Sequence, residues 1–242
     1  TVIIVLNTAM AMETGFIDDE AVDAAFWVGM PGSKGCESFG KILAGDINPS
    51  GHLTDTYAYA LESAPSYYNF GDYTYSNFEG NNKYVYYQEG VYVGYRYYET
   101  AAADGYIDYD ETVQFPFGYG LSYTTFDREV GETKLGEIGG TISADDTETN
   151  NGSVAGKDVV QLYYASPYDP AEGIEKSAID LGAFAKTSLL EPGASETVTL
   201  TLNVDDMAAY DYRNAQCYVL GSGDYALRLQ TDSHNVKVNG DG

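Results

Sequence analysis

The sequence is poor in basic residues and in long apolar runs, and each shortage narrows what the chain can be. It carries 12 Lys and Arg against 37 Asp and Glu, which gives a formal net charge of −25. A field of that sign repels nucleic acids and anionic membrane surfaces, but it does not repel neutral partners such as sugars. No apolar run reaches the roughly 18 residues that a transmembrane helix needs. We therefore expect no nucleic-acid partner and no membrane span in this chain.

Cysteine and histidine are equally scarce. The two cysteines, Cys36 and Cys217, lie far apart in the sequence, so we expect no disulfide framework. The two histidines, His52 and His234, are also remote from each other, which argues against a metal centre or a Ser-His-Asp arrangement. The sequence thus predicts neither a metal site nor a cofactor.

The first part of the chain has the alternation of strands and helices that is typical of α/β proteins. Residues 2–6 and 24–30 are continuous apolar runs, which suits parallel strands buried on both faces. A helix is expected from about Lys34, ended by Gly45, and residues 52–57 are predicted to form a third strand. This rhythm indicates a doubly wound sheet, but three strands cannot cover both of its faces. Because the chain starts inside a strand and without Met, we expect it to be a piece of a longer polypeptide.

From residue 126 onward the pattern changes to short strands separated by turn sequences. Residues 159–164 are rich in β-forming side chains, and alternation returns at residues 225–229. In residues 197–204 every second side chain is apolar, namely Val198, Leu200, Leu202 and Val204. Short strands at regular spacing predict an antiparallel β-sandwich.

Most of the 24 tyrosines lie between residues 57 and 123. A tyrosine buries a large ring and keeps a hydroxyl for a polar partner. Two interpretations stay open: the segment packs over a domain surface or interface, which we favour, or its rings stack on sugars. Within this segment, Glu89 and Arg96 are predicted to form a structural ion pair.

Two stretches of the Tyr-rich region are the most informative of the chain: residues 87–99 (YQEGVYVGYRYYE) and residues 115–126 (FPFGYGLSYTTF). Together, in this order, they resemble the C-terminal half of family 3 glycoside hydrolases, the β-glucosidase and β-xylosidase group. Five further segments resemble the family in the same order: residues 2–8, Trp27 with Pro31, Gly32 and Gly35, and residues 43–53, 152–163 and 190–193. The match is imperfect after Trp27, because Val28, Gly29 and Met30 stand where the family has one residue.

The resemblance implies an α/β plus all-β architecture. A partial doubly wound α/β sandwich would be followed by a fibronectin-III-like antiparallel β-sandwich. We expect residues 1–120 to be the C-terminal part of the α/β sandwich domain, including the Tyr-rich wrapping segment. Residues 121–242 are then the fibronectin-III-like β-sandwich.

The resemblance also implies a glycosidase that hydrolyses β-linked glucosides or related glycosides. Retaining hydrolysis uses a nucleophile and an acid/base, two carboxylates about 5–5.5 Å apart. In the family the Asp nucleophile lies on a TIM barrel, and the acid/base Glu usually lies upstream of the strand that opens this chain. Neither motif has a counterpart here. We therefore expect no catalytic residue on this chain and no activity of the chain alone. Its expected partners are a TIM-barrel catalytic domain, of the same polypeptide or a companion chain, and a small carbohydrate substrate.

Three glutamates are candidate substitutes for the acid/base. Glu13 and Glu37 are better explained as acidic residues at helix starts, and Glu89 as half of the ion pair with Arg96. Ligands of α/β sheets bind at the carboxyl ends of the strands. The residues that end adjacent strands, and that we expect to border the substrate cleft, are Asn7, Thr8, Met30, Pro31 and Gly32.

A second interpretation is a non-catalytic carbohydrate-binding or structural scaffold module built on the same folds. An open apolar face on the α/β part would favour the hydrolase, because such a patch requires a covering partner. Saturable sugar binding in the absence of any barrel would favour the module. For location we expect secretion or the cell surface of a bacterium, with the cytoplasm as the alternative.

Overall fold

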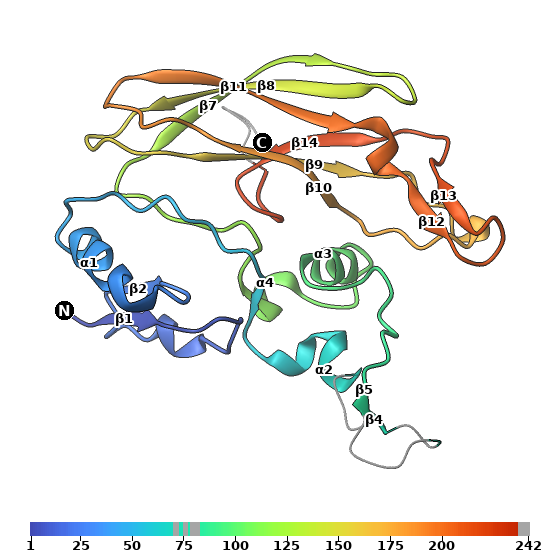
Figure 1. The fold of residues 1–242 in the computed structure, drawn as a ribbon, viewed down its shortest axis with the longest axis horizontal. Coiled ribbons are helices and arrows are strands. Elements are labelled where there is room, and N and C mark those ends of the chain that lie inside the picture. The colour runs from blue at the N-terminus through green and yellow to red at the C-terminus, as the bar shows by residue number, and fades with distance from the viewer. Residues whose placement is uncertain (70–72, 75–76, 78–82, 237–242) are drawn as a thin grey trace.

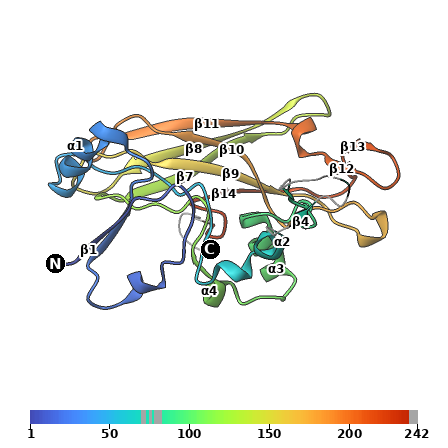
Figure 2. The same cartoon turned by 60° about the horizontal axis from the view of Figure 1, so that its bottom comes forward.

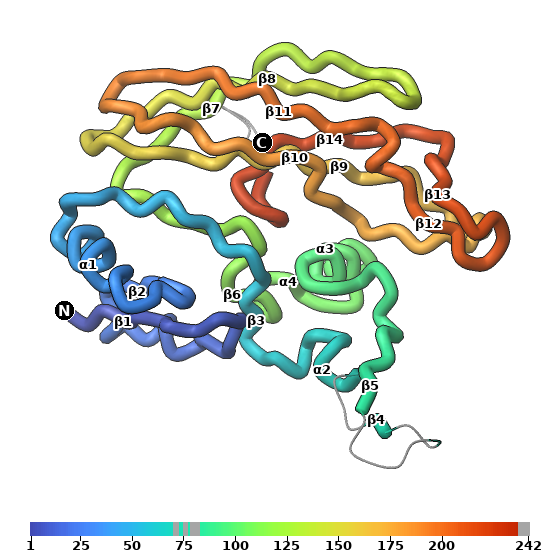
Figure 3. Tube along the Cα trace, in the orientation of Figure 1, coloured from blue at the N-terminus to red at the C-terminus, as the bar shows by residue number. Residues whose placement is uncertain are grey.

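The computed structural model describes residues 1–69, 73–74, 77 and 83–236, which form three parts. A β-sandwich (residues 124–236) forms one long layer, and beneath it lie an α/β unit (residues 1–53) and the Tyr-rich segment (residues 57–123) (Figure 1). The rotated view and the tube show the α/β unit at one end of the sandwich, with α3 and α4 of the Tyr-rich segment nearer its middle and β12 and β13 at its far end (Figures 2 and 3).

The α/β unit is a two-stranded parallel sheet with one helix. Strands β1 (Ile3–Leu6) and β2 (Ala24–Trp27) pair in parallel, and the 3-10 helix η1 (Gly15–Asp18) lies in their connection. Helix α1 (Gly32–Leu43) packs on them, with the rings of Phe26 and Phe39 5.6 Å apart. Gly45 follows this helix at φ +82°, the left-handed conformation that ends helices. The two predicted strands and the predicted helix are confirmed.

The third predicted strand, residues 52–57, is wrong. Only its last residue lies in a strand, β3 (Tyr57–Ala58), which pairs with β6 (Val113–Phe115) in a sheet of its own. The Leu53 N–H donates to the carbonyl of Tyr119, and the Leu53 carbonyl accepts from the Gly118 N–H, both at 2.8 Å. Because these partners take the hydrogen-bonding groups of Leu53, the stretch cannot extend the β1–β2 sheet.

The Tyr-rich segment consists of short elements around a small core of Ala58, Tyr98, Tyr109 and Val113. Packing is therefore the role of these tyrosines, as the favoured interpretation has it, whereas Tyr86, Tyr87 and Tyr106 are exposed. Between β3 and β6 the elements are η2 (Leu61–Ser63), α2 (Pro65–Asn69), β4 (Tyr73–Thr74), β5 (Lys83–Tyr84), α3 (Tyr95–Ala103) and α4 (Tyr109–Thr112).

Two antiparallel sheets form the sandwich. One has the order β11 (Ser195–Asn203), β8 (Thr141–Asn150), β7 (Phe126–Lys134), and the other β10 (Asp180–Lys186), β9 (Val159–Ala165), β14 (Ala226–Gln230). A hairpin of β12 (Ala209–Asp211) and β13 (Cys217–Val219) and the 3-10 helices η3 (Pro170–Glu172) and η4 (Val204–Met207) complete it. Side chains from both sheets share one core, which includes Leu162, Leu200 and Leu202. The predicted sandwich and the inward face of residues 197–204 are confirmed.

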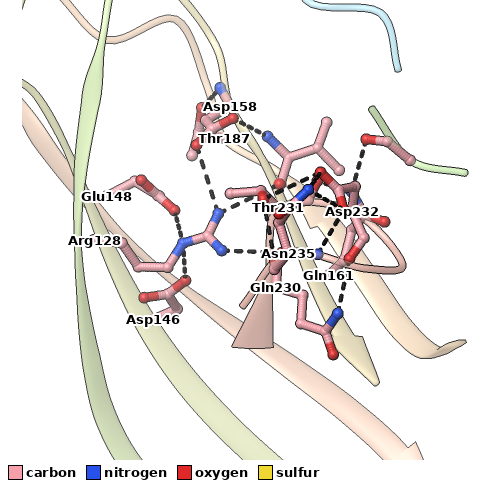
Figure 4. Close-up of polar contacts among 12 residues, drawn as sticks. Arg128, Asp146, Glu148, Asp158, Gln161, Thr187, Gln230, Thr231, Asp232 and Asn235 are labelled. Carbon is pink, nitrogen blue, oxygen red and sulfur yellow. Dashed lines mark hydrogen bonds and ion pairs between the residues drawn. The ribbon is translucent and has the colours of Figure 1, made fainter. Parts of the chain in front are cut away.

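Part of the sandwich interior is polar, with a network of buried charged and amide side chains around Arg128 (Figure 4). Arg128 of β7 is 1 % exposed, and its Nε lies 2.9 Å from Asp146 Oδ2 and also donates to Glu148 Oε1. Its Nη1 donates to the carbonyl of Gln230 at 3.0 Å, and its Nη2 lies 3.6 Å from Asp158 Oδ2. Arg128 thus ties both sheets together, since its partners come from β8, from the start of β9 and from β14.

Helix α3 joins the Tyr-rich segment to the sandwich. Arg96 Nε lies 2.6 Å from Asp180 Oδ1 at the start of β10, and the Tyr95 hydroxyl accepts from the Leu181 N–H at 2.9 Å. One turn later the Thr100 hydroxyl accepts from the Ala178 N–H at 2.9 Å. Arg96 and Thr100 are four residues apart and so lie on the same face of α3, which is the face that contacts the sandwich.

An α/β part followed by an antiparallel sandwich confirms the predicted fold class. The predicted domain boundary between residues 120 and 121 stays a prediction. No helix among the described residues has both the length and the apolar character needed to cross a bilayer.

Candidate substrate-cleft site

The loops that follow β1 and β2 lie together, because the two strands are parallel and end at the same edge of the sheet. Asn7 Nδ2 donates to the Gly29 carbonyl at 2.9 Å, and Trp27 Nε1 donates to the Thr8 carbonyl at 3.0 Å. The loops are thus tied to each other in both directions. Gly29 accepts this geometry at φ +60°, a conformation that side chains rarely adopt.

The structure brings the five predicted cleft residues to this edge. Asn7 and Thr8 directly follow β1, and Met30 follows β2. Pro31 and Gly32 begin helix α1. Met30 is 75 % exposed, and Met10 in the neighbouring loop is 73 % exposed, so the edge presents flexible apolar side chains to its surroundings. That these residues border a substrate cleft stays a prediction.

A large cavity opens beside this edge. Its volume is about 890 Å³, and β1, β2, α1, the loop 49–53 and the segment 115–123 line it. Apolar and aromatic side chains dominate the lining, including Phe26, Trp27, Phe39, Ile42 and Tyr119. Protein interiors are close-packed, so a space of this size is a pocket between the α/β unit and the segment 115–123 rather than a packing gap.

His52 places an imidazole on the cavity lining. Its Nδ1 is buried and has no hydrogen-bond partner among the described residues. Burial lowers the pKa of His52, against the opposing influence of Asp158, because a charged imidazole is poorly solvated there. The ring is therefore neutral at pH 7 and suits a packing role.

The glutamates that were weighed as acid/base substitutes have structural partners. Glu13 Oε1 accepts from the Leu61 N–H at 3.0 Å at the start of η2, and Glu37 lies 3.2 Å from Lys41 Nζ one turn along α1. Glu89 Oε2 accepts from Asn69 Nδ2 at 2.8 Å. Each of these glutamates thus has a contact within the protein, although Glu37 lies in the middle of α1 rather than in its first turn and Glu89 contacts Asn69 rather than Arg96.

The predicted pair of Glu89 and Arg96 has a different arrangement in the structure. Among the ion pairs of the described residues, Arg96 is joined to Asp180 rather than to Glu89. Glu89 instead holds the end of α2 through Asn69. Arg96 attaches the Tyr-rich segment to the sandwich, whereas Glu89 makes its contact within the segment.

Sequence reasoning missed a cluster of Glu99, Ser233 and His234. Glu99 Oε1 accepts from Ser233 Oγ, and Glu99 Oε2 lies 2.9 Å from His234 Nδ1. Glu99 lies more than 130 positions before Ser233 and His234, so no local sequence pattern predicts the cluster. Within the described ranges, no group of three or more His, Cys, Asp or Glu side chains is arranged to hold a metal ion, and both cysteines are exposed and free.

Comparison with known proteins gives two family matches. Residues 1–95 match the glycosyl hydrolase family 3 C-terminal domain, and residues 158–233 match the fibronectin type III-like domain. The resemblance stated from the motifs is thereby confirmed.

Several β-glucosidases align with nearly the whole chain. "Beta-glucosidase A" of Butyrivibrio fibrisolvens is 36% identical, and the alignment covers 98% of this chain and 29% of that protein. "Beta-glucosidase" of Ruminococcus albus is 35% identical, and the alignment covers 97% of this chain and 23% of that protein. The chain thus spans less than a third of the length of these relatives.

Solved structures agree. A β-glucosidase from Paenibacillus barengoltzii superposes with a TM-score of 0.84 at 38% identity, covering 100% of this chain and 25% of that one. β-Glucosidase 3B of Thermotoga neapolitana, solved with glucose, superposes with a TM-score of 0.79 at 34% identity, covering 99% and 30%.

Proposed function

Since the chain corresponds to the C-terminal region of family 3 glycoside hydrolases, we propose that it is the non-barrel portion of an enzyme that hydrolyses β-linked glucosides or related glycosides. The two carboxylates of a retaining mechanism are supplied, in this proposal, by a TIM-barrel catalytic domain and the remainder of the α/β sandwich domain. These belong to the same polypeptide or to a companion chain. The 242 residues alone are inactive.

The observation that carries the proposal is the unfinished state of the α/β unit. Parallel strands normally occur in sheets that are covered on both faces, yet Ile3 and Val5 of β1 and the preceding Val2 are 41–46% exposed. Residues of both strands also line the cavity of about 890 Å³. Apolar surface and open space of this kind support the presence of further protein against β1 and β2.

The role of this chain in the reaction is to position and border the site. The loops after β1 and β2, held together by Asn7 and Trp27, place Thr8 and Met30 at the edge where α/β sheets bind ligands. The sandwich holds the Tyr-rich segment beside these loops through contacts with helix α3. None of these residues is proposed as the nucleophile or the acid/base.

Turnover of an aryl β-glucoside tests the proposal. The purified 242 residues and the longer polypeptide that contains them are compared at equal concentration. We expect turnover by the longer protein only. Hydrolysis by the 242 residues that persists through repurification would contradict the proposal.

Variants of the longer protein test the cleft border. Thr8→Ala and Met30→Ala are expected to change KM for the glucoside, while Ser222→Ala, in a turn of the sandwich, serves as the control and leaves KM unchanged. If all three variants have the same KM as the wild-type protein, these loops do not border the substrate cleft.

The exposed tyrosines support a second candidate function, a non-catalytic carbohydrate-binding or scaffold module. Tyr87 and Tyr106 are 79% and 82% exposed, and free phenol rings stack on sugar faces. Saturable binding of cello-oligosaccharides by the isolated chain, lost in Tyr87→Ala or Tyr106→Ala, would favour this module over the hydrolase portion.

A further inference from the structure

A cluster of four side chains fastens the end of the sandwich to the Tyr-rich segment. We call Glu99, Tyr109, Ser233 and His234 the latch cluster. Glu99 Oε2 lies 2.9 Å from His234 Nδ1, and Ser233 Oγ donates to Glu99 Oε1 at 2.9 Å. The ring of Tyr109 stacks on the imidazole, with the ring centroids 3.6 Å apart and the planes at 6°.

The cluster joins elements that are distant in the sequence. Glu99 lies on α3, Tyr109 begins α4, and Ser233 and His234 follow β14. The segment after β14 is further held because the Ser233 N–H donates to the Phe117 carbonyl at 2.8 Å. Asp232 Oδ1 accepts from the His234 N–H at 2.9 Å, which fixes the turn that presents the imidazole. The imidazole is thus held by Glu99 and the Tyr109 ring, and its backbone by Asp232.

The charges that face this imidazole are negative. Glu99 faces it from α3, Asp110 from α4 and Asp232 from its own segment, and Tyr109 contributes a neutral ring. The hydrogen bond to Glu99 raises the pKa of His234, and the carboxylates of Asp232 and Asp110 act in the same direction. Glu99 is only 9% exposed, and a buried carboxylate is costly without a positive partner. The geometry therefore favours an imidazolium at this position.

We propose that the latch cluster is a protonation-dependent latch: protonated His234 holds residues 231–236 against α3 and α4, and loss of its proton loosens this attachment. The histidine is more basic in the folded chain than in the unfolded one. Its contribution is accordingly complete below the unfolded value of 6.5 and is lost as the pH rises through the higher folded value. The proposal concerns this chain alone and does not depend on the proposed hydrolase function.

Titration of the two imidazoles by NMR is the first test. The chain has only two histidines, so the spectrum of His52→Ala assigns the imidazole signals of both. We expect His234 to titrate above 6.5 and His52 below it, because burial lowers the pKa of His52. In Glu99→Gln the upward shift of His234 should become smaller, because only Asp232 and Asp110 then raise the pKa, whereas Ser233→Ala should keep it. A His234 that titrates at or below 6.5 in the wild-type chain would overturn the latch.

Hydrogen exchange at the Ser233 amide is the second test, and it measures the attachment itself. After correction for intrinsic exchange, we expect severalfold more opening at pH 8 than at pH 5.5. His234→Asn keeps a donor near the Nδ1 position but does not titrate, so its opening should be the same at both pH values. His234→Phe keeps a ring for stacking on Tyr109 but loses the hydrogen bond, and it should open at both.

Amides of β9 in the sandwich core serve as the internal control: any pH dependence of their exchange should be the same in the wild-type chain and in every His234 variant. Equal protection of the wild-type Ser233 amide at pH 5.5 and pH 8 would overturn the proposal. So would a pH-dependent opening that survives in His234→Asn.

Discussion

Arg96 on helix α3 is paired with Asp180 on strand β10, with 2.6 Å between Nε and Oδ1. Burial of Asp180 is substantial, because its side chain is 16% exposed, whereas that of Arg96 is 44% exposed. Together with the Tyr95 hydroxyl, which accepts from the Leu181 N–H next to Asp180, this pair fixes where the Tyr-rich segment meets the sandwich.

A double-mutant cycle between these two residues should show their coupling. We expect Arg96→Ala and Asp180→Asn to be non-additive by about 1 kcal/mol in the free energy of unfolding, as for a partly exposed ion pair. The matched control is the cycle of Arg96→Ala with Glu89→Gln, which should be additive. Urea denaturation measures both cycles. A larger coupling for Glu89 than for Asp180 would restore the pairing first predicted from the sequence.

The buried polar network around Arg128 should make the free energy of unfolding depend on pH, because it contains Glu148. Burial, together with Asp158 and Asp146, raises the pKa of Glu148 to about 7, although Arg128 opposes the shift. The folded value lies above the unfolded one of 4.5, so stability that is present at low pH is lost as the pH rises toward 7. At about 1.4 kcal/mol for each pKa unit, the loss is on the order of 3 kcal/mol.

Replacement of Glu148 by Gln removes the titrating group while keeping an oxygen for Arg128. We expect Glu148→Gln to be more stable relative to the wild-type chain at pH 8 than at pH 5. Glu129→Gln, on the exposed face of β7, is the control and should leave the pH dependence unchanged. Denaturation curves at the two pH values measure this, and parallel changes in both variants would contradict it.

Gly118 in the FPFGYG motif should be hard to replace. It has φ +85°, and a Cβ there would collide with the side chain of Gln161. Gln161 is unable to yield freely, since its Nε2 donates to the Thr231 carbonyl at 2.6 Å and its Oε1 accepts from the Tyr163 hydroxyl at 2.8 Å. The residue therefore combines a left-handed backbone with a crowded site.

Gly118→Ala and Gly139→Ala separate these two effects. Gly139 has φ +79°, but a Cβ there meets nothing within 4 Å, so its substitution carries the backbone cost alone, about 1–2 kcal/mol. We expect Gly118→Ala to lower the free energy of unfolding by about 1 kcal/mol or more beyond that. Thermal denaturation of the two variants measures the difference, and equal losses would show that Gln161 moves aside.

The sandwich core should tolerate little truncation. Leu200 is 2% exposed and packs between the sheets, so Leu200→Ala should cost about 2–5 kcal/mol. Leu189→Ala is the control, because Leu189 is 57% exposed, and it should cost far less. Urea midpoints measure both, and similar losses would place Leu200 outside the core.

Local patterns in the sequence predict β1, β2, β11 and the family, but not the course of residues 52–57. The alternation of Val198, Leu200 and Leu202 predicts which face of β11 is buried, because side chains of a strand point alternately to its two faces. The apolar runs likewise predicted β1 and β2, and the position of Gly45 predicted the end of α1. The cleft residues were placed at one edge because parallel strands end together.

Long-range partners were decided only by the tertiary structure. For Arg96 the sequence offers 37 acidic residues, and the nearest motif favoured Glu89, whereas the fold delivers Asp180 from another sheet. In the same way, Leu53 bonds to Gly118 and Tyr119 instead of extending the β1–β2 sheet, and Glu99 meets His234. Periodicity acts within one element and sets its buried face. Which charged or backbone groups meet depends on how separate elements pack, and no local spacing encodes that.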